Sequence, residues 1–160
     1  MALRGIEPVI DELIVYLKAN LAARVAVVAA EAPVLTMPAP AASDFYFGAR
    51  QTFPKYPAIA LSPAPSPITN DRKDRMDIEH TVTLGIYVTD SDEETLARLL
   101  LRYTRAVLEV IVDGRIANTF TFMPDFDGQT VDPLPVRVAD DALFERDMVL
   151  TIRCWKEEVR

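Results

Sequence analysis

The chain has 160 residues, of which 50% are apolar and 26% charged, with a net charge of −7 and a single cysteine. This length and composition are typical of one globular domain, and they exclude wholesale disorder. One cysteine excludes an intramolecular disulfide, and no apolar run reaches the ~20 residues that span a bilayer, so we expect no membrane contact.

The negative charge is unevenly distributed. Residues 1–68 carry as many basic as acidic side chains, so the whole acidic excess lies in residues 69–160. Tight binding to a phosphate backbone needs clustered Lys and Arg, so the charge disfavours a protein that grips nucleic acid. It remains compatible with a surface past which DNA slides without binding.

The first predicted element is an amphipathic helix that begins near Ile6 and ends between Asn20 and Arg24. Its apolar residues recur at three- and four-residue intervals. They are Ile6, Val9, Ile10, Leu13, Ile14, Leu17 and Leu21. The run VAVVAA at 25–30 either extends this helix or forms a short strand, and periodicity does not distinguish the two.

Residues 33–67 contain eight of the twelve prolines together with five aromatic residues, whereas a simple linker is poor in aromatics. The aromatic residues are Phe45, Tyr46, Phe47, Phe53 and Tyr56. Prolines on both sides of AIALS (58–62) remove hydrogen-bond donors, which confines a strand there to an edge or to a few paired residues. We therefore expect a semi-rigid extended arm whose aromatics pack on a neighbouring subunit.

Residues 69–76 mix charges of both signs and predict a solvated hairpin tip, with Arg72, Lys73 and Arg75 as candidate contact residues. From Met76 to Thr89 apolar and polar residues alternate, which predicts a long, half-buried antiparallel strand. The only histidine, His80, lies on its apolar face, where we expect a structural role.

The second predicted helix begins at Ser91, where Ser91 and Glu94 have the spacing of a capping box, and ends at Gly114. Arg98, Arg102 and Arg105 share one of its faces. That face is either solvated, with support from a Glu94–Arg98 pair, or a contact with acidic residues of a neighbouring subunit. The candidate acidic partners are Asp90, Asp92 and Glu93.

The remaining predicted elements are strands at 116–122, at 136–139 and from about Phe144 onward, with a loop at 123–135. The whole pattern predicts an α+β fold with a mainly antiparallel sheet flanked by two helices, in a single domain spanning 1–160.

The residues that catalysis or metal binding would require are missing from the sequence. A lone histidine offers neither a catalytic triad nor a histidine metal site. Asp125, Asp127 and Gly128 fit positions of a calcium loop, but Met123 and Leu134 stand where its first and last ligands belong. We therefore expect no enzyme activity, no metal and no cofactor.

The layout resembles the tail terminator (tail completion) proteins of long-tailed bacteriophages and related phage-like particles. The segments that carry the resemblance are IEPVIDELIVYLKANL (6–21), FYFGARQTFPKYPAIALSP (45–63), MDIEHTVTLGIYVTDS (76–91), DEETLARLLLRYTRAVLEVI (92–111) and DMVLTIRCWKE (147–157). The resemblance covers most of the chain and rests on the order of these segments rather than on one motif.

The resemblance implies a virion protein that closes into a ring, usually a hexamer, at the head–tail junction. Such a ring caps the tail tube, ends its polymerisation, contacts the head-side connector or stopper protein, and lets DNA pass without specific binding. The protein would be made in the host cytoplasm, and the family has no catalytic residues. The 33–67 segment is longer here than in smaller members, which leaves its target open.

Two other functions fit the same sequence. One is a different neck or connector subunit, although adaptors tend to be helical and stoppers rich in strands, so the mixed pattern favours the terminator. The other is a small α+β ligand-binding module, with a pocket between sheet and helices lined by Tyr87, Tyr103 and Trp155.

Overall fold

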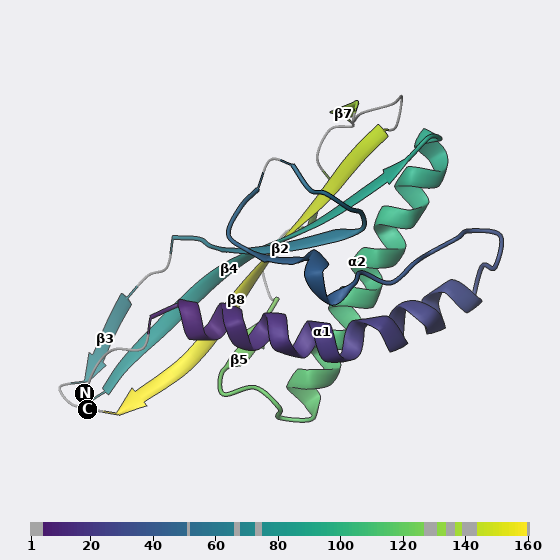
Figure 1. The fold of residues 1–160 in the computed structure, drawn as a ribbon. Helices are drawn as coiled ribbons and strands as arrows, with labels where there is room; N and C mark the ends of the chain where they lie inside the picture. Colours follow the sequence, from purple (N-terminus) through teal and green to yellow (C-terminus); the bar gives the residue numbers. More distant parts are fainter. Residues whose placement is uncertain are drawn as a thin grey trace.

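The computed structural model describes residues 5–50, 52–65, 68–72, 75–126, 131–133, 137–138 and 144–159. Its elements in chain order are α1 (Glu7–Ala30), the short 3-10 helix η1 (Ala42–Asp44), β1 (Phe45–Phe47), β2 (Ala58–Pro63), β3 (Ile68–Arg72), β4 (Arg75–Asp90), α2 (Glu93–Ile116), β5 (Met123–Asp125), β6 (Val131–Pro133), β7 (Arg137–Val138) and β8 (Phe144–Val159). The strands form one mainly antiparallel sheet, and both long helices pack on the same face of it (Figure 1). The predicted α+β fold is confirmed.

Two long strands form the centre of the sheet. β4 and β8 are antiparallel neighbours over their whole lengths, from Arg75 opposite Val159 to Asp90 opposite Phe144. The described strands follow the order β1-β2-β4-β8-β5, with β3 added beside β4, and β6 and β7 added beside β8. The hairpin β3–β4 and the end of β8 project beyond the helices (Figure 1).

The main core lies between the sheet and the helices, and the alternation in β4 builds its floor. Val82, Leu84, Ile86 and Val88 are buried there, as predicted. The helices cover this floor with leucine, isoleucine and tyrosine side chains, including Leu13, Leu17, Leu21, Leu100, Tyr103 and Ile111. His80 and Cys154 are buried opposite each other on neighbouring strands of the same face. Burial, with a smaller contribution from the charge of Glu12, raises the pKa of the Cys154 thiol to about 12.

Helix α1 is longer than predicted, because VAVVAA continues it to Ala30. Val25 and Val28 extend the buried line that begins at Val9, so tertiary packing favours the helix over a separate strand. By length and composition alone, α1 could cross a membrane. In this fold one side of it is part of the core.

Both ends of α2 differ from the prediction. Asp92, rather than Ser91, caps the start, and its carboxylate accepts a hydrogen bond of 2.8 Å from the Thr95 backbone nitrogen. Gly114 does not end the helix, which continues to Ile116. The residue with left-handed backbone is Asn118, at φ 53°.

The predicted strand at 116–122 is wrong. Ile116 ends α2, and the chain then turns, becoming a strand only at β5. Phe120 and Phe122 are buried with ring centroids 5.1 Å apart, and Phe120 also meets Tyr16 of α1 at 4.7 Å. The alternation of aromatic residues therefore comes from a turn that packs on the core. The predicted strands near 136–139 and from Phe144 are confirmed as β7 and β8.

The proline-rich segment folds back onto its own sheet instead of extending away from it. β2 pairs with β4 on one side and β1 on the other, so it is not an edge strand. Upstream, Met37 is buried and the Pro38 carbonyl accepts a hydrogen bond from the Tyr103 hydroxyl. The described part of 33–67 is thus an integral part of the fold, because its apolar side chains find partners within the chain.

Candidate functional site

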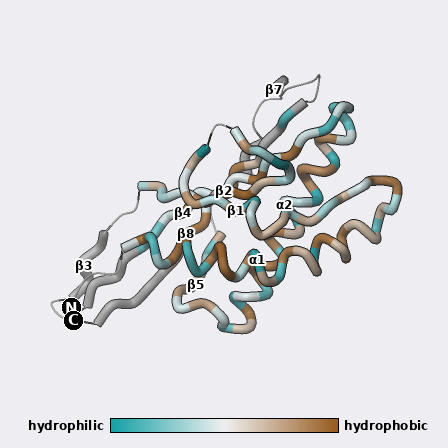
Figure 2. Tube along the Cα trace, viewed as in Figure 1, coloured by the Kyte–Doolittle hydropathy of each residue, from teal (hydrophilic) through white to brown (hydrophobic). Residues whose placement is uncertain are grey.

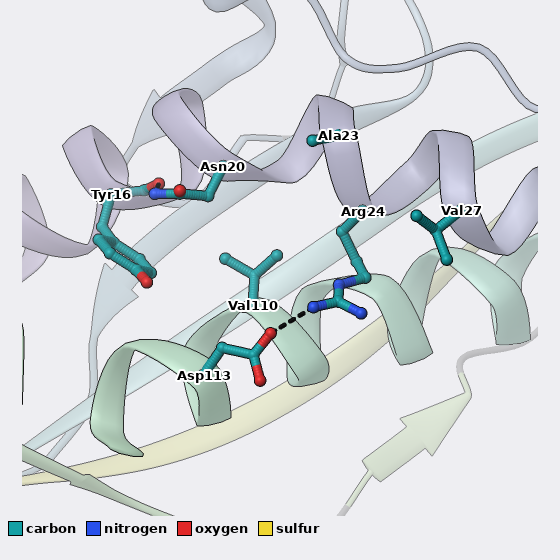
Figure 3. Close-up of a pocket in the computed structure, with 7 residues that line it drawn as sticks. All are labelled: Tyr16, Asn20, Ala23, Arg24, Val27, Val110 and Asp113. Atoms are coloured by element: carbon teal, nitrogen blue, oxygen red, sulfur yellow. Dashed lines mark hydrogen bonds and ion pairs between the residues drawn. The ribbon is translucent and has the colours of Figure 1, made fainter. Parts of the chain in front are cut away.

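A groove lies where α1 crosses α2 on the outer side of the helical layer (Figure 3). It has a volume of about 280 Å³. Its lining comes from successive turns of α1 (Tyr16, Asn20, Ala23, Arg24 and Val27) and from Val110 and Asp113 of α2. The spacing of three or four residues within α1 puts these side chains on one side of that helix.

The charged groups of the groove are already paired. The Arg24 guanidinium donates to Asp113, as Figure 3 shows, and lies 3.5 Å from Glu109. The Asn20 amide donates to the Tyr16 carbonyl at 2.8 Å. No nucleophile next to a base is present among the described lining residues, so the groove is better suited to packing than to catalysis.

Beside this groove, α1 presents to solvent a row of small apolar side chains with Lys18 at its edge. We call it the α1 stripe, and it consists of Val15, Ala19, Ala22, Ala23, Ala26 and Ala30, all exposed. Val15 is 66% exposed, and Val27 at the groove edge is 55% exposed. Figure 2 shows apolar colours continuing along the second half of α1. Residues 25–30 of α1 are apolar at every position, and a helical segment of this kind normally has all its sides covered. The α1 stripe is therefore the strongest candidate interaction surface.

Sequence reasoning missed the α1 stripe. The available signal was VAVVAA, a run with apolar residues at every position of the helix rather than along one side. Ending the helix before Val25 hid the length of the outer face.

The arginine face of α2 is largely engaged within the chain. Arg98 pairs with Glu94 at 2.7 Å, as the solvated-face alternative predicted. Arg105 binds Glu31, at the end of α1, at 2.6 Å and Glu109 at 2.7 Å. Its hydrogen bond lowers the pKa of the Glu31 carboxyl.

Arg102 contacts a backbone carbonyl in the last turn of α1. Its guanidinium donates to the Val28 carbonyl at 3.3 Å. The last turn of α1 has no basic residue of its own, so Arg102 and Arg105 supply positive charge to the negative end of the helix dipole. A contact of these arginines with a second subunit stays a prediction.

Four of the five predicted contact aromatics are covered within the chain. Tyr46 and Phe53 are buried with Ala58 and Ala60 on the sheet face away from the helices, and Tyr56 and Tyr87 pack against them. Phe45 is buried in the main core. Phe47, in contrast, is 49% exposed.

A hydrogen bond fixes this aromatic cluster to the sheet. The Tyr56 hydroxyl donates to the buried carboxylate of Glu145 at 2.6 Å. Arg50 lies over the Tyr46 ring, 4.3 Å from its centroid. The cluster therefore covers one end of the sheet face that points away from the helices.

The predicted hairpin tip is formed by β3 and β4. Arg72 ends β3 and Arg75 begins β4, where the backbone places them opposite each other, and Lys73 lies outside the described residues. Their part in an interface remains a prediction.

The predicted ligand pocket is not formed by the residues proposed for it. Tyr103 is 2% exposed in the core beneath the helices, whereas Tyr87 is on the opposite sheet face. Only the backbone position of Trp155 in β8 is described. Among the described residues no three His, Cys, Asp or Glu side chains are grouped to hold a metal ion. Asp127 of the rejected calcium loop lies outside them, and Asp125 pairs with Arg115 and Arg153.

Comparisons with known proteins give little further guidance. No family model matches the chain, and no curated protein sequence is similar to it. A similar solved structure is a chain of the "Virion of native gene transfer agent (GTA) particle". It is 15% identical with a TM-score of 0.31, and the match covers 87% of this chain and 94% of that one. A TM-score this low carries no argument about function.

Proposed function

We propose that the chain is a non-enzymatic structural protein of a phage-like virion and forms a ring at the head–tail junction. The ring, a hexamer by the family resemblance, caps the tail tube, ends its polymerisation and joins it to the head-side connector. The sequence layout described above supports this assignment, and a neck subunit other than the terminator is the nearest alternative.

The observation that carries the proposal of an assembly subunit is the α1 stripe. A chain with a net charge of −7 leaves a row of exposed alanine and valine side chains along α1 from Val15 to Ala30, with Lys18 as the exposed charge at its edge. Exposing such a face costs free energy that burial against another subunit recovers. An acidic protein with arginines paired internally also suits a channel through which DNA moves without binding.

Purified protein tests the proposal directly. We expect rings in negative-stain images and a discrete oligomer in sedimentation velocity. Tail tubes from the same particle, capped at one end by labelled protein, would distinguish a terminator from another neck subunit. A strictly monomeric protein at high concentration that ignores tail tubes contradicts the proposal.

A further inference from the structure

The outer side of α2 carries leucines in its middle and opposite charges at its two ends. Residues seven apart in a helix lie on the same side of it, two turns from each other. In α2 this spacing connects Glu94, Leu101, Leu108 and Arg115, which we call the α2 line. Leu101 is 63% exposed, and Leu108 is only partly buried at the edge of the core. An amphipathic helix normally turns polar residues to solvent, so these leucines indicate a contact surface.

The α2 line remains open beside α1. Helix α1 reaches α2 through Arg24, which binds Glu109 and Asp113 on an adjacent side of the helix. Val112 is 38% exposed and Ile116 is 78% exposed, and they extend the apolar surface from the leucines toward the end of α2. This surface consists of large branched side chains, whose exposure to water is costly.

The charges on the α2 line match those of a second copy that runs antiparallel. If Leu101 of one copy lies beside Leu108 of the other, a two-fold axis passes between positions 104 and 105. The same register brings Arg115 of each copy beside Glu94 of the other, so opposite charges meet at both ends. The Glu94 side chain is 74% exposed and that of Arg115 is 44% exposed, so both are accessible. Charge complementarity therefore favours the same helix of a second copy.

The existing ion pairs are compatible with this register. Near the two-fold axis Arg105 meets its own copy, but in each chain it is paired with Glu31 at 2.6 Å and with Glu109 at 2.7 Å. These carboxylates offset the like charges at the centre. At the end of the line Arg115 lies 3.8 Å from Asp125, a long contact that leaves the guanidinium room for a second carboxylate.

We infer that the free protein pairs with a second copy of itself through α2, antiparallel and about a two-fold axis. This inference goes beyond the proposed ring, because a two-fold contact uses the same surface on both copies and joins them in pairs. Two copies with a net charge of −7 repel each other, and the opposite charges at both ends of the α2 line offset part of that repulsion.

The size of the contact predicts a weak dimer. The α2 line is about 32 Å long, and packed helices lie about 10 Å apart. The buried area is therefore on the order of 300–400 Å² per partner, below the ~800 Å² of a standard interface and in the range of transient contacts. We expect dimers at roughly 100 μM protein and monomers at roughly 1 μM.

Sedimentation velocity of four variants and their combination tests the inference. Leu101→Glu should lower the association constant at least about tenfold, because it places a charge in the apolar centre. Val34→Glu is the control and should leave the constant unchanged, since Val34 is 93% exposed in the loop after α1. Glu94→Lys or Arg115→Glu alone puts like charges together at both ends and should weaken pairing about fivefold. The two reversals combined should restore it to within about threefold of wild type.

Cysteine pairing tests the direction and register of the helices. Leu101→Cys should form a disulfide with Leu108→Cys when the two variants are mixed and oxidised. Neither variant should pair with itself, because like positions are about 10 Å apart along the helix axis. A disulfide of Leu101→Cys with itself overturns the antiparallel register. Circular dichroism and thermal unfolding establish that every variant keeps its fold.

Other outcomes separate this pairing from the proposed ring. Dimers that tolerate Leu101→Glu, or a combined charge reversal no better than either single one, overturn the inference. A wild-type chain that stays monomeric at roughly 100 μM yet caps tail tubes overturns the pairing and leaves the proposed ring intact. A chain that forms the mixed disulfide but ignores tail tubes overturns the ring and supports the pairing.

Discussion

Gly114 lies where α1, α2 and the aromatic turn after α2 meet. A Cβ atom at this position would be 2.7 Å from Phe120 Cε2 and 2.8 Å from the Tyr16 ring. Glycine in a helix costs about 1 kcal/mol relative to alanine, so close packing must outweigh that cost for glycine to be the better residue. Its role is steric, since its backbone is helical.

Gly114→Ala should lower the free energy of unfolding by about 1–2 kcal/mol, because overpacking exceeds the gain in helix propensity. Urea denaturation measures this change. Gly5→Ala is the control, since no atom lies within 4 Å of a Cβ there. Unchanged or increased stability of Gly114→Ala would mean that both rings move aside freely.

The contact between Tyr56 and Glu145 links the proline-rich segment to β8. Tyr56→Phe removes a hydrogen bond to a buried carboxylate and should cost about 1.5–3 kcal/mol. Tyr46→Phe is the control, because the Tyr46 hydroxyl makes no hydrogen bond among the described residues. A double-mutant cycle with Glu145→Gln isolates the pair, and a coupling near zero would contradict its role in holding the segment.

At the scale of elements, acid should weaken the start of α2. The Thr95 backbone amide lowers the pKa of Asp92 below its ordinary value of 3.8. A lowered pKa contributes stability that is present above the unfolded pKa and is lost as pH falls through the folded pKa. The Asp92 cap therefore stabilises α2 more at neutral pH than in acid.

Asp92→Ala should lower Tm by about 2–4 °C at pH 7 and by progressively less below pH 4. Asp92→Asn keeps an acceptor for Thr95 and should retain most of the stability while losing the acid dependence. Thermal unfolding followed by circular dichroism from pH 7 to pH 2 compares the three proteins. A constant deficit of Asp92→Ala at every pH would contradict a carboxylate cap.

The elements that the sequence predicted well are those with many repeats of one period. β4 alternates over fourteen residues from Met76 to Thr89, so its buried face followed directly from the pattern. Helix ends depend on fewer residues, and there tertiary contacts decided the outcome. Gly114 looked like a stop signal, but Phe120 and Tyr16 require a glycine within the helix.

The candidate site was harder to predict than the fold, because it depends on what remains uncovered. The aromatics of the proline-rich segment suggested an intersubunit contact, yet Tyr46 and Phe53 are buried on their own sheet. The α1 stripe could not be predicted in this way, because alanine has no functional group that marks an interaction surface in a sequence. Its significance requires knowing which side of α1 faces the core.

For the whole molecule, the response of assembly to salt separates the two proposed contacts. If copies meet through the mainly apolar α1 stripe, salt screens the repulsion between acidic copies and should strengthen assembly. If instead Arg98, Arg102 and Arg105 bind acidic residues of a neighbour, salt should weaken it. Sedimentation velocity at about 50 mM and about 500 mM NaCl, below and above the ~150 mM of physiological ionic strength, measures the sign of this response.

The position of Cys154 has a practical consequence for these measurements. It is the only cysteine, it is fully buried, and its thiol stays protonated at neutral pH because its pKa is about 12. Thiol reagents attack the thiolate, so the folded native chain should remain unmodified. Any single cysteine introduced on the surface thus becomes a selective attachment point for a fluorophore or spin label, without first replacing the natural residue.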